Sequence, residues 1–111
     1  MKSYHVHITT AAERDLSRAV DYIEFSLKNP LAADSLADEA EETLSGLSHM
    51  PERFPLVDDR LLAAWGIRLV QIGNYLAFYT VSQTASTVYV LRFLYGKSDW
   101  MSILRSSMIS E

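Results

Sequence analysis

Four residues in the second half of the chain have side chains suited to chemistry on an anionic substrate: Arg68, Arg92, Tyr95 and Lys97. Guanidinium and ammonium groups bind phosphate or carboxylate oxygens, and a phenol can donate or accept a proton. Because the ordinary pKa of tyrosine is about 10, Tyr95 needs an unusual environment to act as a base. The alternative, which we favour, is that the arginines pair with carboxylates of this chain and the tyrosines pack at the edge of a sheet.

Histidines are the other residues that could do chemistry. His5 and His7 lie two positions apart, so on a strand they share one face and could chelate a metal. The only further histidine, His49, lies in a distant segment. We therefore expect surface or interface histidines, no metal site and no cofactor. The chain has no cysteine, which excludes a disulfide framework, a thiolate nucleophile and a cysteine zinc site.

The net charge of the chain argues against a protein that binds nucleic acid. Its formal net charge is −4, whereas proteins that bind polyanions usually carry a positive field. The distribution is uneven: residues 1–52 carry ten acids and four bases, and residues 53–111 carry four acids and six bases. A local basic patch in the second half is one interpretation, and charges scattered over solvated faces are the other.

The length of 111 residues suits one domain, which we place at residues 1–111. No apolar run approaches the roughly 20 residues of a membrane span, and no secretory signal pattern is present at the start. We therefore expect a cytoplasmic protein with no membrane partner.

The elements that must position these residues begin with a strand, where apolar residues alternate over residues 4–8. Thr10 followed three residues later by Glu13 predicts a capping box, which starts a helix that runs to about Lys28. Asn29 and Pro30 then predict the cap and first residue of a second helix. Since the connection is so short, the two helices should form an antiparallel hairpin.

The second half predicts strands. Two prolines make residues 50–55 a loop, and residues 56–65 have no clear pattern. Three runs with strand composition follow, at 67–72, 75–81 and 87–93, the first two joined by a tight Gly73-Asn74 turn. Asp99 can cap a short helix at 100–104, after which we expect a frayed end.

The predicted order is therefore β-αα-βββ. This is an α+β fold, a two-layer sandwich in which a helical hairpin packs on a mostly antiparallel four-stranded sheet, with a short C-terminal helix. We expect the opposite sheet face to be open and to receive a partner or substrate.

This order, with these particular residues, resembles the RelE/ParE toxins of bacterial type II toxin–antitoxin systems over roughly Tyr4 to Leu104. No single segment is diagnostic, but together, at this spacing, they are specific. The matching segments are Ile8 to Leu16, Asp21 to Ile23, Leu44 to Phe54, Gly66 to Tyr79 and Val90 to Trp100.

The resemblance implies one of two activities. RelE-like members cut mRNA on the ribosome, whereas ParE-like members are thought to poison DNA gyrase and lack the nuclease residues. In RelE-like nucleases an arginine follows the tyrosine that opens the second hairpin strand, and here that position is Leu76. A second arginine normally follows the Gly-Lys of the last turn, and here that position is Ser98. Two cationic positions are therefore empty, each worth about 2–4 kcal/mol of transition-state stabilisation.

We therefore expect a ParE-like toxin of the plasmid-stabilisation type. It should inhibit growth by binding a target such as DNA gyrase rather than as an enzyme, and a cognate antitoxin from a neighbouring gene should neutralise it. One alternative is a ribosome-dependent mRNA endonuclease that uses Arg68, Arg92, Tyr95 and Lys97, and another is a non-toxic antitoxin-binding module. The residues that we expect to contact the target or the antitoxin are Arg68, Arg92, Trp100 and Met101.

Overall fold

The computed structural model describes residues 2–109 of the chain. Within these residues no helix is both long and apolar enough to cross a membrane. The elements are β1 (His5–Ile8), α1 (Thr10–Asp21) with a π-helical turn (Tyr22–Ser26), α2 (Pro30–Ser45), 3₁₀ turns at Gly46–Ser48 and Pro51–Arg53, α3 (Arg60–Ala64), β2 (Arg68–Ile72), β3 (Tyr75–Ser82), β4 (Thr87–Tyr95) and α4 (Trp100–Ile109).

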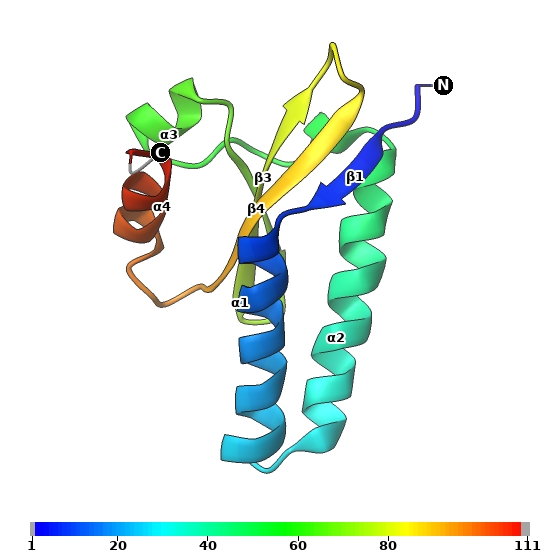
Figure 1. The fold of residues 1–111 in the computed structure, drawn as a ribbon, viewed down its shortest axis with the longest axis vertical. Coiled ribbons are helices and arrows are strands. Elements are labelled where there is room, and N and C mark those ends of the chain that lie inside the picture. The colour runs from blue at the N-terminus through cyan, green and yellow to red at the C-terminus, as the bar shows by residue number, and fades with distance from the viewer. Residues whose placement is uncertain (1, 110–111) are drawn as a thin grey trace.

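The strands form one sheet in the order β1-β4-β3-β2 (Figure 1). β2 and β3 form a hairpin, β3 pairs antiparallel with β4, and β1 pairs with β4 in parallel. The parallel pair ends where Ile8 lies opposite Val90, so among the described residues no strand pairs with the second half of β4 on that side. This confirms the predicted mostly antiparallel sheet. It also leaves one edge of β4 for α1 to cover.

The turn from β1 into α1 satisfies the polar groups at that edge. Thr9, not Thr10, is the N-cap: its hydroxyl oxygen accepts a hydrogen bond from the backbone N–H of Ala12 and donates one to the carbonyl of Leu91. The predicted cap was one residue too late because Thr9 is still extended and continues the strand, with its own N–H donating to Val90. The same hydroxyl therefore ends β1 and starts α1.

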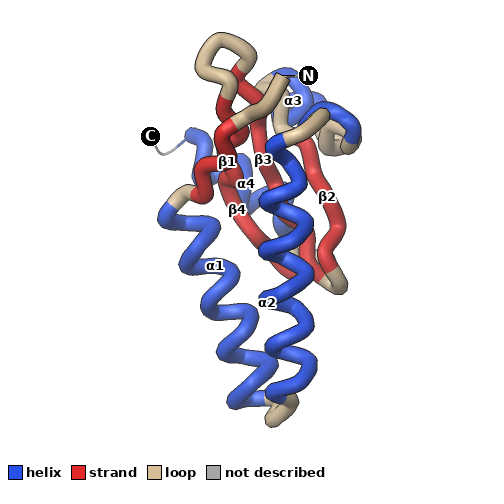
Figure 2. The backbone as a smooth tube through the Cα atoms, turned by 90° about the vertical axis from the view of Figure 1, so that its right-hand side faces the viewer, coloured by secondary structure: helices blue, strands red, loops and turns tan. Residues whose placement is uncertain are grey.

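The helical hairpin packs on one face of the sheet, as predicted (Figure 2). Asn29 caps α2 by accepting from the N–H of Ala32, and Pro30 opens the helix. The hairpin meets inward-facing residues of β2, β3 and β4 in a first core, and its far end extends past the sheet. The helix residues of this core are Ala12, Ala19, Leu36, Ala40, Leu44 and Leu47.

The opposite face is not open, which corrects the expectation. A second core forms there, in which residues of α3 and α4 pack with residues of β3 and β4 such as Phe78 and Leu94. Figure 1 shows α3 and α4 on the side of the sheet away from the hairpin. Fully buried Leu62 and Leu104 anchor the two helices. The cover is partial, because the face toward β1 keeps exposed side chains such as His7 and Tyr89, whose rings meet edge to face.

The α-helices also differ from the prediction, whereas the strand ends differ by only one or two residues. Helix α1 ends at Asp21 and the chain continues as a π-helical turn. The unpatterned stretch contains α3, capped by the Asp59 carboxylate, which accepts from the N–H of Leu62. Helix α4 runs to Ile109, five residues beyond the predicted end, so residues 105–109 are helical rather than frayed. Residues 110–111 lie outside the described part of the chain.

Candidate functional site

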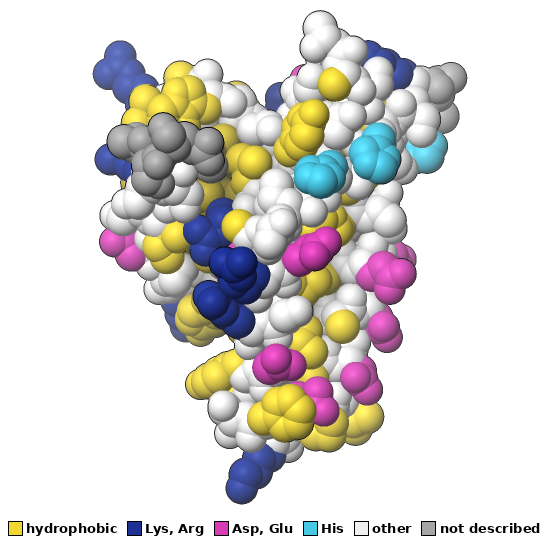
Figure 3. All heavy atoms as spheres, viewed as in Figure 1, with side chains coloured by type: hydrophobic (Ala, Val, Ile, Leu, Met, Phe, Trp, Pro, Cys, Tyr) yellow, Lys and Arg dark blue, Asp and Glu magenta, His cyan; other side chains and the backbone are white. Residues whose placement is uncertain are grey.

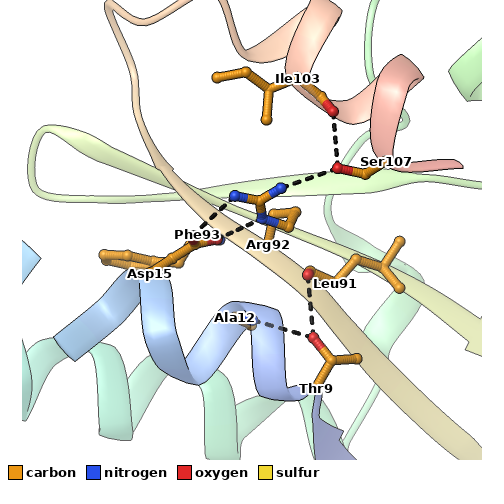
Figure 4. A network of polar contacts seen from close by, with 8 residues as sticks. All are labelled: Thr9, Ala12, Asp15, Leu91, Arg92, Phe93, Ile103 and Ser107. Atoms are coloured by element: carbon orange, nitrogen blue, oxygen red, sulfur yellow. Dashed lines mark hydrogen bonds and ion pairs between the residues drawn. The ribbon is translucent and has the colours of Figure 1, made fainter. Parts of the chain in front are cut away.

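Arg92 belongs to a polar network that joins three elements (Figure 4). Its Nε and Nη2 donate to the two carboxylate oxygens of Asp15 at 2.6 and 3.0 Å, and Nη1 donates to the Ser107 hydroxyl at 3.0 Å. The Asp15 carboxylate also accepts from the backbone N–H of Phe93, on the edge of β4 that β1 leaves unpaired. The two side chains are only 20% and 8% exposed. Arg92 therefore ties α1, β4 and α4 together.

Arg68 is also held by its own chain. It opens β2, opposite Tyr79, and its Nη1 donates to the carbonyls of Phe54 at 2.6 Å and Glu52 at 3.2 Å. Its Nη2 lies 3.8 Å from the Glu52 carboxylate. The guanidinium thus fixes the loop that follows α2. Both arginines pair as the carboxylate interpretation predicted.

Tyr79 is buried behind this loop. The ring is 0% exposed and the hydroxyl donates to the carbonyl of Pro51 at 2.6 Å. Burial raises the pKa of Tyr79 to about 12, against the opposing effect of the nearby Arg68 and Arg53 charges. A buried phenol that holds its proton so firmly is a structural hydrogen-bond donor and a poor base.

Tyr95 and Lys97 are the two predicted residues that the fold brings together in the open. Both are exposed, and both line a depression of about 360 Å³ at the end of β4. The remaining lining is uncharged and consists of Gln71, Asn74, Leu76 and Gly96. Leu76, the position at which the resemblance to RelE-like nucleases would place an arginine, lines this depression, and neither Arg68 nor Arg92 does.

Trp100 and Met101, predicted as partner contacts, lie partly buried against the second core. The Trp100 ring is 5.1 Å from that of Phe78, so it packs as a core residue at the start of α4. A contact role for either residue stays a prediction. His5 and His7 are exposed as expected, and within residues 2–109 no group of three or more histidines and carboxylates could hold a metal ion.

Sequence reasoning missed a larger cavity on the hairpin side of the same sheet end. It measures about 570 Å³ and lies between the π-helical turn and the β2–β3 turn, lined by Tyr22, Ile23, Leu27, Asn74, Tyr75 and Tyr95. Partial burial raises the pKa of Tyr75, and the nearby hydroxyls of Tyr95 and Tyr22 add to the effect. The three tyrosines come from α1's extension, β3 and β4, so no spacing in the sequence could have grouped them.

Comparison with known proteins identifies relatives of this chain. Residues 6–100 match the family described as the ParE toxin of the type II toxin–antitoxin system parDE. A chain of the RelBE2 toxin–antitoxin complex from Mycobacterium tuberculosis is 28% identical, with a TM-score of 0.61 over 86% of this chain and 93% of that one. A chain of the chromosomal ParDE system of P. aeruginosa is 16% identical, with a TM-score of 0.69 over 86% and 98%, which shows the shared fold. No curated protein matched the chain.

Proposed function

This chain belongs to the ParE toxin family of type II toxin–antitoxin systems, and we propose that it arrests bacterial growth by binding a protein target such as DNA gyrase. It does so without cutting RNA. A cognate antitoxin, the product of a neighbouring gene, binds it and neutralises it. The relatives of this fold that were solved as toxin–antitoxin complexes support that pairing.

Arg68 and Arg92, the two arginines on strands, already bind other groups of this chain, which argues against catalysis. Cleavage of RNA at a ribose 2′-OH needs cations that contact the phosphate as charge builds on it. Arg92 already binds a carboxylate through two hydrogen bonds, and Arg68 already binds two carbonyls. Freeing Arg92 would leave the Asp15 carboxylate, 8% exposed, without its partner, at a cost of about 3–5 kcal/mol.

The test is inducible expression of the chain in bacteria, with protein synthesis and the DNA-damage response followed in parallel. We expect filamentation and a DNA-damage response while translation continues, and inhibition of supercoiling by purified gyrase. Prompt loss of translation with intact DNA would contradict the proposal. Normal growth, with the chain shown to be soluble and folded, would leave an antitoxin-binding module without toxicity.

One observation favours the mRNA endonuclease as the second candidate: Tyr95 and Lys97 line one open depression. If translation stops, cleavage of ribosome-bound mRNA should be measured for Tyr95→Phe and Lys97→Ala. The matched control is Tyr89→Phe, an exposed tyrosine on the same strand that lines none of these cavities. Cleavage that is lost in the first two variants and kept in the control would establish the endonuclease.

A further inference from the structure

Three tyrosines line the cavity on the hairpin side, Tyr22, Tyr75 and Tyr95, and we call them the tyrosine cage. The rings of Tyr75 and Tyr95 meet edge to face, with centroids 5.6 Å apart and planes inclined by 65°. Phe93 stacks on one face of Tyr75, with ring centroids 5.1 Å apart and an interplanar angle of 8°, which fixes that ring. Tyr22 lines the same cavity. Such ring faces attract cations, because the face of an aromatic ring is negative.

The π-helical turn contributes to this arrangement. The N–H of Leu27 donates to the carbonyl of Tyr22, five residues earlier, so one extra residue is accommodated in the turn. Tyr22 and Leu27 both line the cavity. Tyr22 is 54% exposed, Leu27 56% and Tyr95 44%, so the cage opens to solvent and a side chain can enter from outside.

The end of the hairpin that carries Tyr22 has a net negative charge, which also favours a cation. Glu39 lines an adjoining cavity of about 370 Å³ that shares Ile23, Asn74 and Tyr75 with the cage. The outer part of the hairpin, residues 21–39, carries five carboxylates (Asp21, Glu24, Asp34, Asp38 and Glu39) and one base, Lys28. Figure 3 shows carboxylates and hydrophobic side chains together on this projecting end.

The same charges decide between occupants. A second copy of this chain would bring five carboxylates and one lysine against an identical set, which is repulsive. A segment with lysine or arginine among apolar residues meets complementary charge, and its apolar side chains find Leu27 and Ile23 beside the rings. The base Lys97 does not line the cage, but it lines a neighbouring depression that shares Asn74 and Tyr95 with it.

We propose that this three-tyrosine cage receives a lysine or arginine side chain from a basic amphipathic segment of the antitoxin. The cation sits against Tyr22, Tyr75 and Tyr95, with the Glu39 carboxylate beside it. The inference rests on the proposed function, since its occupant is the antitoxin, and it adds which surface is bound and by which residue type.

The experiment is a calorimetric titration of the full-length chain with the purified product of the neighbouring antitoxin gene. Tyr22→Ala and Tyr95→Ala should each raise the Kd about tenfold or more, because each removes one exposed wall of the cage. Tyr89→Ala, an exposed tyrosine elsewhere on β4, should leave the Kd unchanged. Glu39→Gln should weaken binding, whereas Glu41→Gln, exposed on the same helix outside both cavities, should not. Circular dichroism verifies that each variant is folded.

A second experiment tests the tyrosine cage separately from the proposed function. Tetramethylammonium, a cation that aromatic cages bind, is titrated into the chain alone while the ring resonances of the tyrosines are followed by NMR. We expect shifts at Tyr22, Tyr75 and Tyr95 and none at Tyr89. If the wild type binds the antitoxin and the cage variants bind it with the same Kd, the cage proposal is wrong and the proposed function stands. Absence of any antitoxin binding would overturn the proposed function, and unshifted cage resonances would then overturn the cage as well.

Discussion

The hydroxyl group of Tyr79 makes one hydrogen bond that holds the loop after α2 to the sheet. It is buried and donates to the carbonyl of Pro51, which accepts it as the loop passes over the sheet. Replacing Tyr79 by Phe leaves that carbonyl without this donor, so we expect the free energy of unfolding to fall by about 1–3 kcal/mol. Chemical denaturation of Tyr79→Phe beside Tyr89→Phe measures this. Equal stability of the two variants would show that the hydrogen bond is dispensable.

Tyr79 also predicts how the protein responds to alkali. Its folded pKa of about 12 lies above the ordinary value of 10.0, so the folded state holds the proton more tightly than the unfolded state. This contribution to stability is complete below pH 10 and is lost as the pH rises from 10 toward 12. The pH profile of Tm should therefore fall less steeply in this range for Tyr79→Phe than for the wild type. Parallel profiles would contradict the assignment.

Asp59 makes the opposite prediction at acid pH. The hydrogen bond from Arg105, and then that from the N–H of Leu62, hold the pKa of this carboxyl below its ordinary value of 3.8. Because the folded pKa is depressed, its contribution to stability is present above pH 3.8 and is lost as the pH falls below that value. Asp59→Asn keeps a capping oxygen and loses the charge, so its Tm should vary less between pH 2 and 5. Asp58→Asn is the neighbouring control.

The sequence alone did not decide which groups Arg68 and Arg92 contact, and the structure shows why. The sequence predicted that Arg68 and Arg92 either contact a phosphate or pair with carboxylates. Their carboxylate partners, Glu52 and Asp15, lie 16 and 77 positions away, and only the fold brings them within reach. The absence of an arginine at Leu76 could be recognised from the sequence, because the resemblance to the RelE/ParE toxins fixed that position in a strand.

At the scale of elements, Arg92 joins the N-terminal helix to the C-terminal one through the unpaired edge of β4. Arg92→Ala would leave Asp15 nearly buried and unpaired, so we expect a loss of about 3 kcal/mol in the free energy of unfolding. Asp15→Asn with Arg92→Gln keeps the hydrogen-bonding groups without the charges and should recover part of that loss. Denaturant unfolding measures the free energy of unfolding of Arg92→Ala, of Asp15→Asn and Arg92→Gln singly, and of the double variant. Additive losses would show that the two residues act independently.

The helical hairpin and the three C-terminal strands could be predicted from the sequence, since their apolar periodicity and their caps and turns agree. Helix α3 could not, because five residues are too few for a helical period. The cover on the second sheet face could not either. It places Leu104 of α4 in one cluster with residues such as Val57 and Ile67, and no local pattern records which distant face an amphipathic helix will find.

At the scale of the whole molecule, the sheet separates two cores of different origin. The hairpin builds the first core from the N-terminal half, and α3 and α4 build the second from the C-terminal half. Fully buried leucines lie in both, Leu47 in the first and Leu104 in the second. The second core is smaller and its helices are short, so it should open locally before the whole chain unfolds.

Leu47→Ala and Leu104→Ala test this difference with the same chemical change. Each should cost about 2–5 kcal/mol, because each removes a fully buried side chain and leaves a cavity. Leu104→Ala should speed hydrogen exchange mainly in α3 and α4 while the amides of α1, α2 and β3 keep their protection. Leu47→Ala should lower protection throughout, since the first core holds the hairpin to the sheet. If Leu104→Ala lowered protection in the hairpin as much as in α4, the two cores would form one cooperative unit.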